Sequence, residues 1–205
     1  MFRKCRYKIF FTAVVWALLN LSGCSNNQYI EKHAFISWQD NYSKLNNLTF
    51  FKNSGRLGIF TQGRRDGAAY DFEGLSGGYL LVIKSPLGNS LASATVTENT
   101  LALNIGDKSY RDDYAALMFE QAFGFAIPVD KLKPILLGIP QGKRVFDNEG
   151  RIVKAQWDGY SISYSGIMQS DGLRIPKAVT VNHGDYTIKT SVSSFVLKGN
   201  DHENQ

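Results

Sequence analysis

Cysteine and histidine are scarce in this sequence. Its two cysteines are Cys5 and Cys24, and its three histidines are His33, His183 and His202. No spacing of His and Cys suits a metal ion, and no glycine-rich loop of the kind that binds phosphate is present. We therefore predict a protein that is not an enzyme and that holds no cofactor and no metal.

A long apolar run occurs only near the N-terminus. Four basic residues come before it, the run Ile9–Leu19 follows, and Leu-Ser-Gly-Cys ends the segment at 21–24. This order is typical of a secretory signal peptide, and the run is too short to span a membrane. We expect residues 1–23 to be the signal peptide and residues 25–34, which are polar, to be a tether.

The ending Leu-Ser-Gly-Cys is similar to the bacterial lipobox. The resemblance implies cleavage before Cys24 and acyl chains on that residue. An ordinary signal peptide followed by an unrelated cysteine is the alternative. In the sorting pattern of lipoproteins an aspartate after the cysteine marks retention at the inner membrane, so Ser25 favours the outer membrane.

Little net charge and no free thiol are expected once the signal peptide is removed. All the charged residues of 1–23 are basic, so the formal net charge falls by four, from +5 to +1. A nucleic-acid partner is therefore not expected. Cys5 also leaves, so no intramolecular disulfide can form. The rest of the chain is long enough for one core, and we predict a single domain over 35–197 with a flexible tail over 198–205.

The period of the apolar residues changes along the predicted domain. From Phe35 to about Asn47 apolar residues follow helical spacing. After that they alternate with polar residues, in short segments separated by turns such as "RRDG", "PLGN" and "GDK". Two helices interrupt this pattern. Asp112 is the expected N-cap of a helix over 113–123, and Pro128 is expected to open a short helix that ends at Leu137-Gly138.

The fold class follows from this pattern: mainly β, with about eleven antiparallel strands and a helical insert. One face of many strands is apolar, and the other is mostly polar. A single curved sheet of this kind either fills its interior with its own side chains or holds an apolar guest. The pattern alone leaves both possibilities open.

The turn Ser85-Pro86-Leu87-Gly88 carries an apolar residue where turns are usually polar. Proline and glycine suit the second and fourth positions of a β-turn. A leucine between them is held toward water. Single exposed leucines are common, so the turn by itself does not indicate a function.

The span 48–140 resembles the LolB family of outer-membrane lipoproteins, which receive other lipoproteins from a periplasmic carrier. The matching segments are "GRLGIF" at 55–60, "YLLVIKSPLG" at 79–88, "TLALNIGDKSY" at 100–110 and "GFAIPVDKLKPILLGIP" at 124–140. Ile135 and Phe72 stand where the family often has tryptophan. The C-terminal third is similar mainly in its strand pattern.

The resemblance implies an incomplete, open β-barrel that is capped by helices and has an apolar cavity for acyl chains. It also implies a monomer on the outer membrane whose partners are a LolA-like carrier, acylated lipoprotein cargo and outer-membrane lipid, with lipid attached at Cys24. The turn Pro86, Leu87 and Gly88 would contact the membrane. The expected cavity residues are Leu57, Ile59, Tyr70, Phe72, Tyr79, Leu81, Ile83, Leu101, Leu103, Phe123, Ile135, Trp157 and Ile162.

Two other functions are compatible with the sequence. One is a lipocalin-like outer-membrane lipoprotein that binds a small apolar ligand and needs neither a protein partner nor a membrane-facing leucine. The other is a structural lipoprotein of the envelope with a filled core. Binding of a fatty acid, and transfer of a lipoprotein from a carrier, distinguish these alternatives.

Overall fold

The computed structural model of the chain describes residues 36–98, 100–124, 128 and 130–198. The predicted signal peptide, Cys24 and the predicted tether 25–34 lie outside the described residues, and so does the tail beyond Lys198. The limits of these segments, and those of the domain predicted for 35–197, therefore stay predictions.

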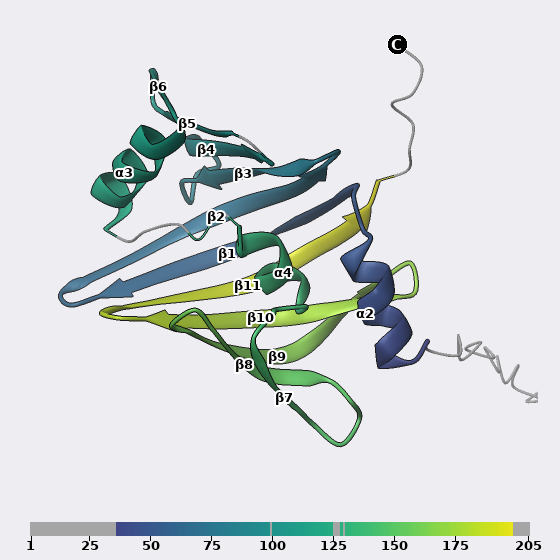
Figure 1. Ribbon diagram of the computed structural model, residues 1–205. Helices are drawn as coiled ribbons and strands as arrows, with labels where there is room; N and C mark the ends of the chain where they lie inside the picture. Colours follow the sequence, from purple (N-terminus) through teal and green to yellow (C-terminus); the bar gives the residue numbers. More distant parts are fainter. Residues whose placement is uncertain (1–35, 99, 125–127, 129, 199–205) are drawn as a thin grey trace, which may run out of the picture. The chain divides into compact units, whose positions relative to one another are not determined.

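Eleven strands form one antiparallel sheet in the order β6-β5-β4-β3-β2-β1-β11-β10-β9-β8-β7 (Figure 1). The strands are β1 (Phe51–Thr61), β2 (Arg64–Leu75), β3 (Gly78–Lys84), β4 (Ser90–Thr97), β5 (Leu101–Ile105), β6 (Lys108–Arg111), β7 (Lys143–Phe146), β8 (Ile152–Trp157), β9 (Tyr160–Ser170), β10 (Leu173–His183) and β11 (Tyr186–Leu197). Pairing of β1 with β11 joins an N-terminal and a C-terminal meander, and β6 and β7 are left as separate edges. The predicted mainly-β fold with an open antiparallel sheet is confirmed.

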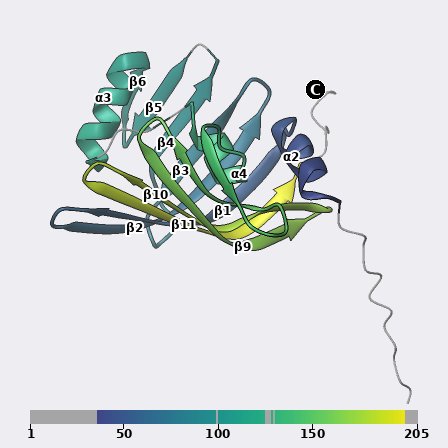
Figure 2. The same ribbon diagram turned by 60° about the horizontal axis from the view of Figure 1, so that its bottom comes forward.

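The alternation of apolar residues places one face of the sheet in the core. In β3, for example, Tyr79, Leu81 and Ile83 are buried, and the residues between them are half-buried. The sheet bends around helix α4 (Leu132–Leu137), as Figure 2 shows. Buried side chains from β1 to β5, from β10 and β11, and from the helices pack into one large hydrophobic cluster on this inner face. A smaller cluster lies over β8 to β10.

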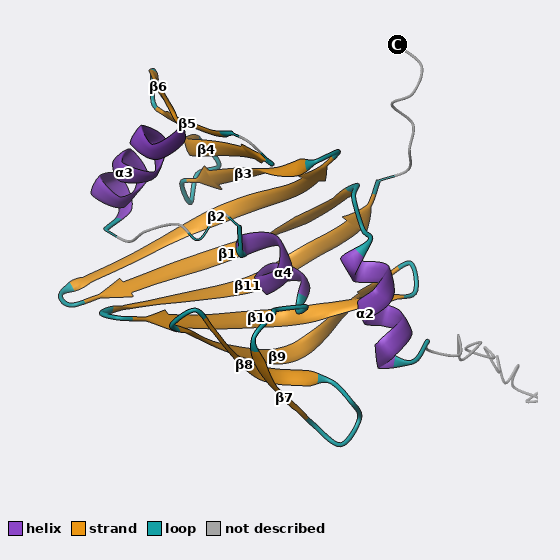
Figure 3. Ribbon diagram, in the orientation of Figure 1, coloured by secondary structure: helices purple, strands orange, loops and turns teal. Residues whose placement is uncertain are grey.

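Helix α2 (Trp38–Asn46) matches the helix predicted near the start of the domain (Figure 3). Its first turn is capped by Ser37, whose hydroxyl oxygen accepts a hydrogen bond from the backbone N–H of Asp40 at 3.0 Å. The buried side chain of Asn41 pairs with the backbone of Arg174 on β10 through two hydrogen bonds, of 2.9 and 2.8 Å. These bonds hold α2 against the start of β10.

The prediction that Asp112 caps the next helix is wrong. Helix α3 (Asp112–Phe123) begins at Asp112 itself, and Arg111, which precedes it, makes no side-chain capping bond. The Asp112 carboxylate instead accepts a hydrogen bond from the backbone N–H of Leu101 on β5, at 3.3 Å. Asp112 also has a positive φ of 50°. The Asp112 carboxylate therefore bonds to β5 and not to the N-terminus of the helix, where the local sequence had placed it.

Helix α4 ends where the sequence predicts but begins later. The carbonyl of Pro128 accepts hydrogen bonds from Lys131 and Leu132, and this turn precedes the helix. Gly138 ends the helix with a φ of 75°, a conformation that glycine adopts without strain. A Cβ at this position would lie 2.6 Å from the ring of Pro176 on β10. Glycine therefore lets the end of α4 pack closely against the inner face of the sheet.

Candidate functional site

A cavity of about 80 Å³ lies between the inner face of the sheet and the helices. Six consecutive strands of the sheet, in the order β3-β2-β1-β11-β10-β9, form its wall, and α3, α4 and Pro128 cover it. Its lining residues are Leu57, Ile59, Tyr70, Leu81, Ile83, Phe119, Pro128, Leu132, Ile135, Leu136, Tyr160, Val179, Val181, Tyr186, Ile188 and Thr190. Within the described part of the chain, no residue of this lining carries a carboxylate, an ammonium, a guanidinium or an imidazole group.

Six of the expected cavity residues line this cavity: Leu57, Ile59, Tyr70, Leu81, Ile83 and Ile135. The other seven lie nearby in the core without lining it. Phe72, Tyr79, Leu101 and Leu103 are buried in the large cluster, and Phe123 packs against that cluster from the end of α3. Ile162 is buried in the smaller cluster, against which Trp157 packs.

Sequence reasoning missed the wall formed by the C-terminal strands. Val179 and Val181 on β10, and Tyr186, Ile188 and Thr190 on β11, face the cavity. Their alternation was visible in "KAVTV" and "YTIKT". Which alternating segments continue the wall beyond β1 depends on the pairing of β1 with β11, however, and that pairing has no signal in the local pattern.

Two tyrosine hydroxyl groups in the cavity lining, those of Tyr70 and Tyr186, stay neutral. The hydroxyl of Tyr70 donates a hydrogen bond to the side-chain oxygen of Asn53 at 3.0 Å inside the core. Burial raises the pKa of Tyr70 and of Tyr186 above the ordinary value for tyrosine. The ring of Tyr160 stacks on His183 at 4.2 Å between ring centres. An apolar, uncharged chamber of this kind suits hydrocarbon and does not suit a charged ligand.

The segment before α4 is held at the end of β8. The ammonium group of Lys131 lies 2.5 Å from the carboxylate of Asp130 and 3.2 Å from that of Asp158 in the turn between β8 and β9. It also lies 5.3 Å from the ring centre of Trp157. A hydrogen bond to Asp130 raises the pKa of Lys131, so its charge persists through the physiological range.

A second cavity, of about 90 Å³, lies between α2, the end of α4 and strands β8 to β10. Arg151 and Arg174 line it together with Trp38, Tyr42 and Tyr164. The guanidinium group of Arg174 stacks over the ring of Trp38 at 3.9 Å. Cationic groups in its lining make this cavity unsuited to acyl chains, in contrast to the one beneath α3 and α4.

The turn between β3 and β4 holds its leucine in water. Leu87 is 89% exposed. The turn is closed by the backbone N–H of Gly88, which donates to the carbonyl of Ser85 at 2.9 Å, and by that of Ser85, which donates to the carbonyl of Asn89 at 2.8 Å. Gly88 has a φ of 90°, which glycine tolerates best. The leucine is therefore presented by an ordered turn.

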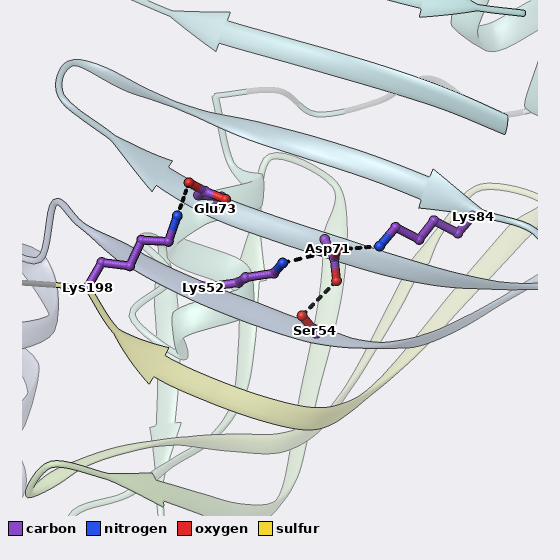
Figure 4. A network of polar contacts seen from close by, with 6 residues as sticks. All are labelled: Lys52, Ser54, Asp71, Glu73, Lys84 and Lys198. Carbon is purple, nitrogen blue, oxygen red and sulfur yellow. Dashed lines mark hydrogen bonds and ion pairs between the residues drawn. The ribbon is translucent and has the colours of Figure 1, made fainter. Parts of the chain in front are cut away.

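An ion-pair network on the outer face of the sheet supports the base of this turn (Figure 4). Asp71 on β2 bonds to Lys84, the last residue of β3, to Lys52 at 3.3 Å and to Ser54 at 2.7 Å. Partial burial alone would raise the pKa of Asp71, but these hydrogen bonds lower it to about 2. Next to this network, Lys198 pairs with Glu73. The end of β3 is thus fixed to β2 and β1 just before the turn begins.

The described residues contain no cluster of three or more His, Cys, Asp or Glu side chains able to hold a metal ion. Within the same residues, no helix has both the length and the apolar character that crossing a bilayer requires.

Comparisons with known proteins identify the family of this chain. The sequence model of the family "Outer membrane lipoprotein LolB" matches residues 49–194. The chain is 28% identical to the outer-membrane lipoprotein LolB of Aeromonas salmonicida over 184 residues, which cover 88% of this chain and 93% of that protein. It is 24% identical to LolB of Pseudoalteromonas translucida over 177 residues, 83% of this chain and 86% of that protein.

Among solved structures, a DUF1329 family protein from Desulfovibrio piger has a similar fold. The TM-score is 0.50 at 9% identity, over 78% of this chain and 92% of that chain. This likeness concerns the fold alone. From the family match over most of the chain and the agreement with full-length relatives, the chain belongs to the LolB family, the outer-membrane lipoprotein receptors of the lipoprotein localisation pathway.

Proposed function

We propose that this protein accepts acylated lipoproteins from a LolA-like periplasmic carrier, holds their acyl chains in the cavity beneath α3 and α4, and releases them into the outer membrane as a monomer. The observation that carries the proposal is the composition of the cavity lining. None of the described residues that form it is Asp, Glu, Lys, Arg or His. Cys24 would carry the protein's own lipid anchor.

The energetics favour an apolar host at every step of the transfer. A covalent acyl chain gains about 0.8 kcal/mol for each CH₂ that leaves water. Three chains with on the order of fifteen methylenes each would therefore cost roughly 35 kcal/mol to expose. Transfer between two apolar cavities, and from a cavity to a bilayer, avoids this cost. The step then needs no nucleotide.

The cavity must widen before it can hold such cargo. At about 80 Å³ it is smaller than the engineered apolar cavity of about 150 Å³ that binds one benzene molecule. Part of its cover is a short helix, α4, whose Leu132, Ile135 and Leu136 contribute to the lining. We expect α4 to move away from the sheet as acyl chains enter, so that their methylenes replace its apolar contacts.

The turn that carries Leu87 assists release and does not anchor the protein. Burying one leucine side chain contributes about 1.5–3 kcal/mol, far less than the acyl chains on Cys24. A free energy of this size is sufficient to insert an ordered turn into the lipid interface. The last inward-facing residue before the turn is Ile83, a lining residue of the cavity, so contact at Leu87 brings this end of the cavity toward lipid.

The test is transfer of a labelled acylated lipoprotein to the mature chain in which Cys24→Ser removes the anchor. We expect uptake from the carrier complex and subsequent delivery to phospholipid vesicles. If the chain takes up free fatty acid but not lipoprotein from the carrier, the lipocalin-like alternative is correct. If neither ligand displaces an apolar fluorescent probe, the cavity is not a binding site and the proposal fails.

A further inference from the structure

A second large apolar side chain is exposed beside the β3–β4 turn. Leu91, near the start of β4, is 45% exposed, and Leu87 at the tip of the turn is 89% exposed. The next residue, Ala92, is buried on the inner face. Leu91 therefore lies on the outer side of the hairpin, four positions from Leu87 and at the same end of the strands.

A β-bulge lies at Leu91. Ile83 pairs with Ala92 and Lys84 pairs with Ser90, so Leu91 is an extra residue with no partner of its own on β3. Bulges bend a strand and change the direction in which a side chain points, and they are common next to functional sites. In a regular ladder Leu91 would lie on the same outer face with Lys84 as its cross-strand neighbour, and the bulge leaves it without that neighbour.

We propose that Leu91 enters the outer-membrane lipid interface together with Leu87, so that the hairpin contacts the bilayer through two leucines and not one. This inference rests on the proposed role of Leu87 in delivery. It assigns the direction in which the hairpin meets the membrane: through the tip and through the outer side of β4.

The chemistry of the segment favours lipid over a protein partner. Residues 85–91, "SPLGNSL", contain no charged side chain, so no ionised group has to leave water when the segment enters the interface. Ser85, Asn89 and Ser90 can form hydrogen bonds with lipid headgroups. The nearest cation, Lys84, is already bonded to Asp71 on the outer face. The hydrogen bonds of the turn order it before contact, which lowers the entropic cost of binding.

The experiment uses the acylated mature protein, reconstituted through its own anchor into vesicles of phosphatidylethanolamine with phosphatidylglycerol as the minor lipid. Leu87→Cys, Leu91→Cys and Val196→Cys are each labelled with an environment-sensitive fluorophore. The thiol of Cys24 is predicted to be a thioether, so the introduced cysteine is the only free thiol. Val196 is the matched control, because it is 50% exposed at the opposite end of the sheet.

We expect a blue shift and quenching by spin-labelled lipid at positions 87 and 91, and neither at position 196. If position 87 responds and position 91 behaves as position 196 does, this inference is overturned while the proposed function stands. If position 87 also stays in water, the proposed role of Leu87 fails. A response at position 91 that requires added carrier would assign Leu91 to protein docking and would likewise overturn the inference.

Delivery of cargo provides an independent measurement. Leu91→Ser should lower the rate of lipoprotein delivery to vesicles by roughly three- to tenfold, in proportion to the apolar area lost. Leu91→Phe should retain it. Uptake from the carrier and the thermal midpoint report whether the variants are folded. Equal delivery by Leu91→Ser and the unchanged protein would refute a membrane contact at this position.

Discussion

The ammonium group of Lys131 lies 3.2 Å from the carboxylate of Asp158, and this ion pair connects the segment before α4 to the turn between β8 and β9. Lys131 immediately precedes α4, which covers the cavity, and Asp158 belongs to the sheet. If α4 has to move for acyl chains to enter, the pair opposes that movement.

Asp158→Asn should therefore make the cavity easier to open. Because Asp158 is largely exposed, the loss of stability should be below about 1 kcal/mol. The rate at which an apolar fluorescent probe enters should rise by roughly two- to fourfold. Stopped-flow fluorescence measures this rate. Asp185→Asn is the control, since Asp185 occupies the neighbouring β10–β11 turn and makes no ion pair among the described residues. An equally large rise in the rate of probe entry in this control would refute a specific role for Asp158.

Leu87→Glu should separate uptake from delivery. The side chain is almost fully exposed and makes no contribution to the core, so folding and uptake from the carrier should be unchanged. A carboxylate at the tip opposes insertion into lipid, so delivery to vesicles should fall by roughly tenfold or more. Val196→Glu, at the other end of the sheet, should deliver cargo normally. Unchanged delivery by Leu87→Glu would rule out membrane contact by the turn.

Val181→Phe should reduce the space for ligand. Val181 is buried and lines the cavity on β10, so the larger ring would occupy volume that an acyl chain needs. We expect binding of a fatty acid probe to weaken by roughly tenfold, with a change in the free energy of unfolding of no more than about 1–3 kcal/mol. Titration fluorimetry and urea unfolding measure the two effects. Val145→Phe, on the exposed edge strand β7, is the control and should bind the fatty acid probe as the unchanged protein does. If both variants bind the probe with the same affinity, the assignment of the cavity is contradicted.

The outer-face network predicts a dependence of stability on pH. The pKa of Asp71, about 2, lies below the value of about 3.9 expected in the unfolded chain. Its contribution is therefore complete above about pH 4 and is lost as the pH falls toward 2. Asp71→Asn should lower the free energy of unfolding at neutral pH by roughly 1–2 kcal/mol and flatten its acid dependence. Urea unfolding at pH values between about 2 and 7 measures this dependence. Asp107→Asn, in an exposed turn, is the control and should show the same dependence of the free energy of unfolding on pH as the unchanged protein.

Part of the candidate site was predictable because its residues carry local signals. Alternation on β1 and β3 placed Leu57, Ile59, Leu81 and Ile83 on an apolar strand face, and the Pro-Leu-Gly turn predicted that Leu87 is exposed. Phe72 shows the limit of this reasoning: it shares its strand face with Tyr70, yet it is packed among core rings and does not line the cavity. Alternation tells which face of a strand is inside, but it does not tell where along that face a space remains.

Leu91 and Asp112 show a second limit. The alternating pattern of "LASATVT" places Leu91 on a strand but gives no sign of the bulge, which exists because β3 and β4 pair out of step at Lys84. Asp112 has the sequence setting of a helix cap, yet its carboxylate bonds to the first residue of β5. In both cases the result depends on pairing between segments, which the local pattern does not encode.

The sequence by itself determined the antiparallel strands, the ordered turn with its exposed leucine, and the lipobox-like ending at Cys24, since each depends on residues that are neighbours in the chain. Only the tertiary structure decided that Val181 and Ile188 lie beside Ile59 in the lining of one cavity, and how large that cavity is. The physical reason is that strand register and close packing arise from contacts between residues far apart in sequence, whose outcome no short pattern encodes.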